Sequence, residues 1–323
     1  MTYSNIQRVR EEFLRLQREI TLSLETLDKQ NRFEGNDTKT PLGGMSKPRI
    51  LSQGQHVEKS AVHFTHSVGQ SLPQAATKRN PNLGGRPFQA VSISVIVHPR
   101  NPFVPTAHMN LRFFEVESGE SSNETTTWYF GGGFDLTPFY PFHEDVIHWH
   151  QMAFAACENS SIYTRFKKQC DEYFFLTHRQ EPRGIGGLFF DDWSEGGFET
   201  SFQLVSRIGN YFWQAYGPIF EKRMTTPWSE AHEEWMLIRR GRYAEFNLAI
   251  DRGTKYGLQS GRRIENVLSS LPPRAMWIYD HKTKPGSQEQ SLIQEFLPPR
   301  DWIKNLSVDK CGDKLSQRVD DKR

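Results

Sequence analysis

AVSISVIVHPRNPFVPTAHMNLRFFEV, residues 90–116, contains two runs in which apolar and polar residues alternate. The runs cover residues 90–98 and 108–116. Alternation with a period of two predicts β-strands, because successive side chains of a strand point to opposite faces of its sheet. Three prolines lie between the runs and exclude a continuous helix through the connection. The stretch therefore predicts two strands joined by a proline-rich loop.

These two strands, and a third predicted over residues 242–251, each have one apolar face and one face rich in polar side chains. A sheet with one solvent-exposed face would show the same alternation. Exposed faces favour Lys, Glu and Thr, however, whereas these faces carry Ser, His, Asn and Arg, which suits the floor of a binding site. The polar-face residues are Ser92, Ser94, His98, His108, Asn110, Arg112, Tyr243, Glu245, Asn247 and Asp251.

Periodicities elsewhere in the chain predict the remaining elements. Residues 30–90 are polar and rich in Gly, Pro and Asn, so long loops with short elements are expected there. The mixture of helices and strands indicates an α+β fold with an extended sheet covered by helices. The predicted helices are 4–29, 143–157, 162–177, 197–222, 228–240 and 259–271, and the further strands are 128–133, 184–193 and 274–280.

The composition excludes several classes of protein. The formal net charge of the 323 residues is only +2, which disfavours nucleic acid or an anionic membrane as a partner. No segment approaches the ~20 apolar residues of a membrane span, and the N-terminus lacks the pattern of a secretory signal. Three scattered cysteines suit neither a disulfide framework nor a zinc knuckle. We therefore expect a cytoplasmic protein without integral membrane association.

Four histidines, His98, His108, His150 and His178, could converge on a metal ion. None is paired at the i, i+4 spacing of helical zinc ligands. His150 lies on the apolar stripe of a predicted helix, where a histidine is more often a core residue. His178 follows a helix end, where the helix dipole explains a histidine equally well. The residues alone leave both interpretations open.

Arginines gather around the third predicted strand and the helix after it. Guanidinium groups suit carboxylates and phosphates, although a solvated basic surface would look the same. Ser260 and Gly261 would add backbone N–H groups at the start of that helix. The P-loop pattern is absent, as is GxGxxG after a strand, so a nucleotide is not the expected anion. The arginines are Arg239, Arg240, Arg242, Arg252, Arg262 and Arg263.

Several long segments between about residues 86 and 303 resemble oxygen-dependent coproporphyrinogen III oxidase, among them HPRNPFVPTAHMNLRFFE, WYFGGGFDLTPFYPF, RGIGGLFFDDW and RRGRYAEFNLAIDRGTKYGL. The resemblance implies a single-domain, large flat antiparallel sheet with α-helices on both faces, and a homodimer. It implies oxidative decarboxylation of two propionates of coproporphyrinogen III to vinyl groups, which gives protoporphyrinogen IX in haem biosynthesis. Molecular oxygen is the implied co-substrate, with no flavin, haem or nicotinamide (NAD) cofactor.

The resemblance also implies roles for individual residues. His108 is the implied proton donor, and Asp251 with Arg252 is the implied catalytic pair. Bacterial-type members are described with a divalent metal cation held by four histidines, here His98, His108, His150 and His178, whereas other members work without metal. The implied substrate contacts are Ser94, Asn110, Leu111, Arg112, Gly261, Arg262 and Arg263.

This chemistry agrees with the polar faces described above. A porphyrinogen has four pyrrole N–H donors at its centre, so the carboxylate of Asp251 can accept several at once. The alternatives are a divergent paralogue acting on a related tetrapyrrole, a histidine-metal oxygenase or hydrolase, and a non-catalytic tetrapyrrole-binding protein. The predicted organisation is an N-terminal helix over residues 1–30, the oxidase domain over 31–303 and a charged, frayed tail over 304–323.

Overall fold

A computed structural model describes residues 4–72, 83–117, 126–259 and 263–303. An antiparallel sheet of eight strands forms its centre, in the order β1-β2-β4-β5-β6-β7-β10, with β3 paired to β4. The strands are β1 (Thr38–Lys39), β2 (Met45–Lys47), β3 (Ile50–Ser52), β4 (Val57–Gly69), β5 (Phe88–Pro99), β6 (Thr106–Val116), β7 (Thr127–Thr137) and β10 (Gly186–Trp193).

The strands predicted over residues 90–98 and 108–116 are confirmed as β5 and β6, which lie side by side at the centre of the sheet. Their register places Ser94 opposite Asn110 and Ser92 opposite Arg112. Directly opposed residues of an antiparallel pair project from the same face, so the polar side chains of both strands share one surface. The predicted strands near 128–133 and 184–193 are confirmed as β7 and β10.

The prediction of long loops over residues 30–90 is wrong, because this part of the chain contains β4. This strand pairs with β5 from the Val57–Pro99 pair to the Gly69–Phe88 pair. Its core-facing side includes Ser60, which is fully buried and donates its hydroxyl hydrogen bond to the Ile96 carbonyl. Because Ser60 is a polar residue on the buried face, the sequence of β4 does not show a clear alternation of apolar and polar residues. The hydrogen-bond partner of Ser60 lies on the neighbouring strand β5.

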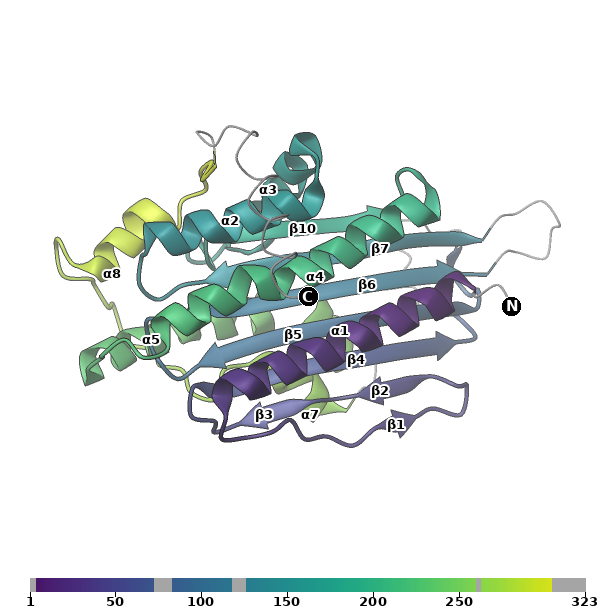
Figure 1. Ribbon diagram of the computed structural model, residues 1–323, viewed down its shortest axis with the longest axis horizontal. Helices are drawn as coiled ribbons and strands as arrows, with labels where there is room; N and C mark the ends of the chain where they lie inside the picture. Colours follow the sequence, from purple (N-terminus) through teal and green to yellow (C-terminus); the bar gives the residue numbers. More distant parts are fainter. Residues whose placement is uncertain (1–3, 73–82, 118–125, 260–262, 304–323) are drawn as a thin grey trace, which may run out of the picture.

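Three helices cover the apolar face of the sheet: α1 (Asn5–Asp28), α2 (His143–Cys157) and α4 (Gly197–Arg223) (Figure 1). All three were predicted at helical spacing. The core lies between them and the sheet, where α1 contributes Phe13 and Leu16, both 2% exposed or less. A further predicted helix is confirmed as α3 (Ser160–Tyr173), which packs against β10.

The other face of the sheet carries α5 (Glu230–Glu245), the π-helical turn η3 (Phe246–Ile250), α6 (Arg252–Gln259) and α7 (Ile264–Val267) (Figure 1). The predicted strand over 242–251 is therefore wrong. The segment continues α5 as helix, and its buried residues Tyr243, Phe246 and Asn247 recur at helical spacing. The local alternation YAEFNLAI fits both periods, and packing against the sheet selects the helical one.

Two further predictions differ from the structure. Residues 274–280 form no strand, and Tyr279 is 99% exposed. Instead of one helix over 259–271, the described part of that segment contains α7 and the short η4 (Leu268–Ser270). The remaining elements are β8 (Phe175–Leu176), β9 (Glu181–Pro182), α8 (Gln288–Ser291) and η5 (Leu292–Phe296).

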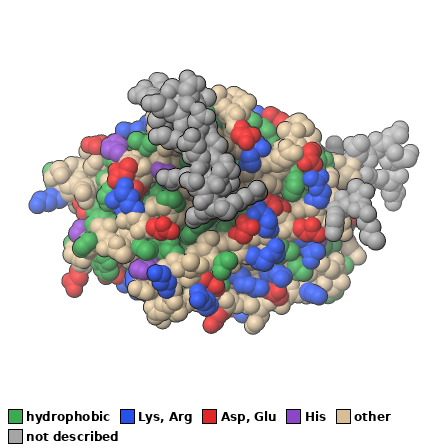
Figure 2. Space-filling model, viewed as in Figure 1, with side chains coloured by type: hydrophobic (Ala, Val, Ile, Leu, Met, Phe, Trp, Pro, Cys, Tyr) green, Lys and Arg blue, Asp and Glu red, His purple; other side chains and the backbone are tan. Residues whose placement is uncertain are grey.

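The surface has the mixed character that the composition predicts. On the face that α1 and α4 cover, basic and acidic side chains are interspersed (Figure 2). Within the described ranges, none of the helices has the length and apolar character needed to cross a bilayer.

Candidate active site

The polar face of the central strands forms a floor on the side of the sheet that carries α5 to α7. Ser94, Asn110 and Arg112 are each partly exposed on this floor. Leu111 points the other way: it is fully buried in the core, and a Cβ at Gly209 of α4 would lie 3.1 Å from its Cδ1. The side chain of Leu111 therefore belongs to the core, and the sheet brings Ser94, Asn110 and Arg112 together.

The glycines of β7 make room for Arg112. Gly131 lies directly opposite Arg112 in the register, and a Cβ there would lie 2.7 Å from Nη2 of the guanidinium. The guanidinium therefore lies against the bare backbone of β7 instead of standing above a side chain. The run of three glycines from Gly131 to Gly133 is part of the extended strand β7.

Asp191 of β10 joins the two arginines that the sequence resemblance assigns to the site. Its Oδ1 accepts a hydrogen bond from Nη2 of Arg112, and its Oδ2 accepts one from Nη2 of Arg252 at 2.5 Å. Arg252 begins α6, and its guanidinium also lies over the ring of Tyr173, 4.8 Å from the centroid. The arginines of β6 and α6 thus meet at one point, which the sequence analysis did not predict.

Asp251 caps the N-terminus of α6 and is not a strand residue as predicted. Its Oδ2 accepts hydrogen bonds from the backbone N–H of Thr254 at 2.7 Å and from its hydroxyl at 2.8 Å. Its Oδ1 accepts the hydroxyl of Tyr173 at 2.9 Å. Burial and the nearby charge of Asp251 raise the pKa of Tyr173, so the phenol stays protonated and remains the donor.

His108 belongs to a chain of buried polar groups beside this pair. Its Nδ1 lies 2.8 Å from Oδ1 of Asp135, whose Oδ2 accepts a hydrogen bond from Arg183 at 2.7 Å. Burial alone would raise the pKa of Asp135, but Arg183 and His108 hold it below its ordinary value. Asp135 is therefore an anion, and it accepts the Nδ1–H of His108 and leaves Nε2 as the atom available for proton exchange.

Asp135 and Arg183 are site residues that the sequence analysis missed. Asp135 lies opposite His108 in β7, so extending the predicted strand at 128–133 by a few residues would have placed it on the polar face. No local signal identifies Arg183, which is 1% exposed and whose guanidinium lies over the rings of Phe174 and Tyr243.

His108 and Asp251 are connected through aromatic side chains. The ring of Phe174 lies 6.0 Å from that of His108 and 4.9 Å from that of Tyr173, whose hydroxyl binds Asp251. Asp251, His108 and Arg112 therefore belong to one cluster on one face of the sheet. Separate locations for these three residues would have removed the basis of the interpretation drawn from the sequence.

The four candidate metal histidines are not brought together within the described residues, which hold no group of three or more His, Cys, Asp or Glu side chains placed to bind one ion. His98 is fully buried, with Nδ1 3.2 Å from the Thr106 hydroxyl and Nε2 2.9 Å from the Ser270 carbonyl. His150 lies on α2, on the opposite side of the sheet, 3.1 Å from both the Tyr163 hydroxyl and the Ile185 carbonyl. Both ring nitrogens of each histidine are therefore occupied.

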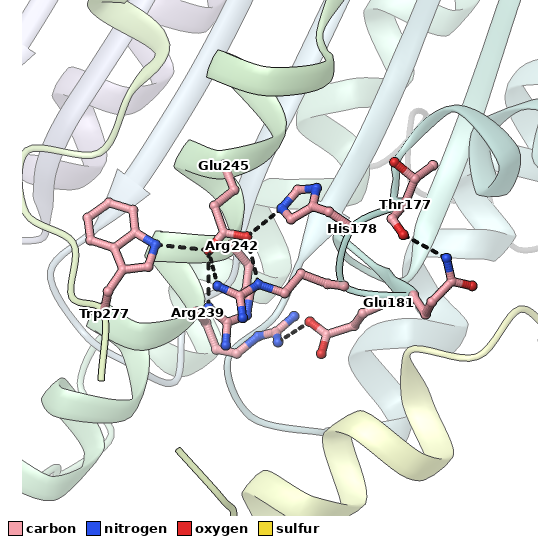
Figure 3. A network of polar contacts seen from close by, with 9 residues as sticks. Thr177, His178, Glu181, Arg239, Arg242, Glu245 and Trp277 are labelled. Atoms are coloured by element: carbon pink, nitrogen blue, oxygen red, sulfur yellow. Dashed lines mark hydrogen bonds and ion pairs between the residues drawn. The ribbon is translucent and has the colours of Figure 1, made fainter. Parts of the chain in front are cut away.

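His178 lies in a third place, in an ion-pair cluster around Glu245 (Figure 3). Its Nε2 is 2.8 Å from Glu245, which also accepts hydrogen bonds from Arg179, Arg242 and Trp277. Together these contacts hold the pKa of Glu245 at about 2, although burial opposes them. The cluster ties the β8–β9 hairpin to α5, and His178 has a structural role in it.

Most of the remaining predicted arginines have acidic partners inside the protein. Arg239 pairs with Glu181 at 2.5 Å, and Arg240 pairs with Glu58 at 2.6 Å. Arg263 is exposed and pairs with Glu265 at 3.0 Å. Ser260, Gly261 and Arg262 lie outside the described residues. Of this group, Arg252 is the one that the structure places beside Arg112.

A comparison with protein-family models agrees with this arrangement. Residues 8–302 match the family model described as coproporphyrinogen III oxidase. The match covers nearly the whole described chain and both faces of the sheet, including all the elements that carry the polar cluster. The chain therefore belongs to the coproporphyrinogen III oxidase family.

Proposed function

We propose that the cluster on the polar face is the active site for the reaction of this family. The chain is an oxidoreductase of haem biosynthesis, and its substrate is coproporphyrinogen III. For each propionate the balance is –CH₂CH₂COO⁻ + O₂ + H⁺ → –CH=CH₂ + CO₂ + H₂O₂. The observation that carries the proposal is the convergence of Asp251, His108 and Arg112 through Tyr173, Phe174 and Asp191.

In this proposal Asp251 binds the centre of the macrocycle. Tyr173 and Thr254 together donate three hydrogen bonds to its two oxygens. A carboxylate has about four acceptor sites, so at least one remains for pyrrole N–H donors. The three protein donors fix the orientation of the carboxylate before the substrate arrives.

Arg112 and Arg252 bind the peripheral carboxylates, because guanidinium groups match carboxylates in charge and geometry. His108 exchanges a proton at Nε2 while the propionate loses carbon dioxide and two electrons pass to oxygen. Asp135 and Arg183 hold the ring of His108 in place for that step. Ser94 and Asn110 provide the floor between these groups.

The family resemblance also suggests a homodimer in the cytoplasm and reaction without a flavin, haem or nicotinamide cofactor, which we include in the proposal. The four histidines do not fit a shared ion within one chain, because His98 and His150 lie on opposite sides of the sheet with both nitrogens engaged. The proposed steps therefore use protein side chains and oxygen alone.

The proposal is tested by the substitution Asp251→Asn. Asparagine can still accept the cap hydrogen bond from Thr254 but lacks the charge, so we expect kcat to fall on the order of 100-fold or more. Turnover is measured under air with coproporphyrinogen III, with an anaerobic incubation as the zero reference, by the fluorescence of the oxidised product. Lys255→Ala, which changes an exposed residue of the same helix and keeps Asp251 and its three donors, is the control and should retain most activity. Near-normal turnover by the Asn variant would remove Asp251 from the mechanism.

A further inference from the structure

The carboxylate of Asp191 forms ion pairs with two arginines. Each of its oxygens contacts a different guanidinium, that of Arg112 from β6 and that of Arg252 from α6. Asp191 is 17% exposed, whereas Arg252 is 48% exposed. The carboxylate is therefore the most buried member of the group, and both arginine side chains extend to it.

Asp191 lies where the regular pairing of β10 with β7 ends. The register with β7 is regular up to Phe190, opposite Gly132, and then shifts before Trp193, opposite Phe130. A bulge of this kind bends a strand and re-aims its side chains. The residue after Asp191, Asp192, has φ +52°, a conformation that asparagine and aspartate adopt more readily than most residues. Asp191 lies two residues after Phe189, whose ring stacks on Tyr173, so strand alternation places its carboxylate on the same face, and the bulge follows it.

Other groups complete the surroundings of the two arginines. Tyr173 stacks on Phe189, with ring centroids 4.2 Å apart, and this pair supports the guanidinium of Arg252 from below. Arg112 lies against Gly131 of β7. Nη2 of each arginine is directed to Asp191, and Nη1 of Arg112 also donates to Oδ1 of Asn110 at 3.5 Å. A guanidinium carries five N–H donors, so each arginine keeps further donors for a ligand carboxylate.

We propose that Asp191 is a positioning residue that holds Arg112 and Arg252 together so that one propionate carboxylate of the substrate contacts both. Two guanidinium groups repel each other, so without the carboxylate of Asp191 the side chain of Arg252 turns to solvent. Substrate binding must then supply the conformational entropy that is lost when Arg252 becomes ordered. The proposal rests on the proposed function in taking these two arginines as the propionate site. An ordinary exposed ion pair would contribute little to either stability or binding.

The test measures binding without turnover. Coproporphyrin III, the oxidised form with all four carboxylates, is titrated into the protein and followed by quenching of protein fluorescence. Asp191→Asn keeps the size of the side chain and removes its charge, and we expect Kd to rise roughly 10- to 100-fold, the loss of one charge-assisted contact. Under turnover the same variant should show raised KM with kcat little changed.

Glu195→Gln is the control, because it removes one nearby carboxylate charge from an exposed pair with Arg165. Its Kd should equal that of the unmodified chain. Equal or tighter binding by Asp191→Asn would overturn the proposal. It would show that the carboxylate of Asp191 only competes with the propionate for the two arginines. A loss of thermal stability together with an equal loss of kcat would also overturn it in favour of a structural role.

A double-substitution cycle separates this inference from the proposed function. If Asp191 acts through Arg252, the pair Asp191→Asn and Arg252→Gln should bind coproporphyrin III no more weakly than Arg252→Gln alone. Additive effects would contradict the inference. If Arg252→Gln and Arg112→Gln themselves leave Kd unchanged, the two arginines do not bind a propionate and that part of the proposed function is rejected. If both arginine variants bind more weakly but Asp191→Asn binds normally, only the role of Asp191 is rejected.

Discussion

Arg240 illustrates how far a single residue can be interpreted from sequence. It was a candidate for anion binding, yet its guanidinium is fully buried and is held by Glu58 at 2.6 Å and the Pro99 carbonyl at 2.6 Å. Glu58 also accepts a hydrogen bond from Arg274 at 2.7 Å. Burial opposes ionisation of Glu58, but the two arginines outweigh it and hold the pKa of Glu58 below 4.5. The anion that Arg240 binds is part of the protein.

We predict that Glu58→Gln destabilises the fold by about 3–5 kcal/mol, because it leaves the charge of Arg240 buried without a partner. Since the folded-state pKa of Glu58 is lowered, its contribution is present above the unfolded-state pKa of 4.5 and is lost as the pH falls through the folded-state value. Urea unfolding at pH 7 and at successively lower pH below 4.5 measures this loss.

In Glu58→Gln, the free energy of unfolding should fall less as the pH is lowered than in the unmodified chain, because the contribution of Glu58 is already absent. Glu265→Gln is the control, because the exposed pair of Glu265 with Arg263 can break without leaving a buried charge. Equal unfolding free energies for Glu58→Gln and the unmodified chain would show that water reaches Arg240.

At the scale of elements, β7 shows that neighbouring glycines serve different purposes. A Cβ at Gly131 would meet the end of the flexible Arg112 side chain at 2.7 Å. At Gly132, φ is +140° and a Cβ would lie 2.0 Å from the backbone oxygen of Asn110. One contact can relax by moving a side chain, and the other cannot relax without moving a strand.

We therefore predict that Gly131→Ala folds normally and raises KM for coproporphyrinogen III about tenfold, because the guanidinium of Arg112 is displaced from the floor. Gly132→Ala should instead lower the melting temperature and the yield of folded protein. Circular dichroism melting and steady-state kinetics distinguish the two. Normal KM in a folded Gly131→Ala variant would show that the position of Arg112 on β7 does not matter to the substrate.

The errors in predicting elements have one common cause. The strand predicted over 242–251 is helix and π-turn, and β4 was predicted as loop. In both segments the local pattern fits more than one structure, and the packing surface decides between them. For β4 that surface is β5, and for η3 it is the polar face of the sheet together with Phe174.

At the scale of the molecule, the sheet separates groups that the sequence could not separate. His150 is part of α2, His98 contacts Tyr243 of α5, and His108 contacts Phe174, which packs on Phe246 of η3. His178 lies in the cluster of Figure 3. We predict that prolonged dialysis against a chelator leaves turnover unchanged and that His178→Gln is as active as the unmodified chain. Metal analysis and oxygen-dependent turnover before and after dialysis check this. Activity that is lost and then restored by one divalent metal would contradict it.

The assembly state is a further prediction at this scale. Light scattering after size exclusion should give twice the chain mass of 37.5 kDa if the family's homodimer holds for this chain. A mass that matches one chain would contradict the dimer while leaving the active-site proposal in place.

The sequence by itself determined the family, most of the helices, the strands β5, β6, β7 and β10, and which residues of β5 and β6 share the polar face. These follow from periods of two and 3.6 residues and from long distinctive segments, which are local properties of the chain. Tertiary structure alone decided that Asp135 and Arg183 support His108, that Asp191 joins Arg112 to Arg252, and that the four histidines stay apart. Such contacts depend on which elements pack on which side of the sheet, and no local period carries that information.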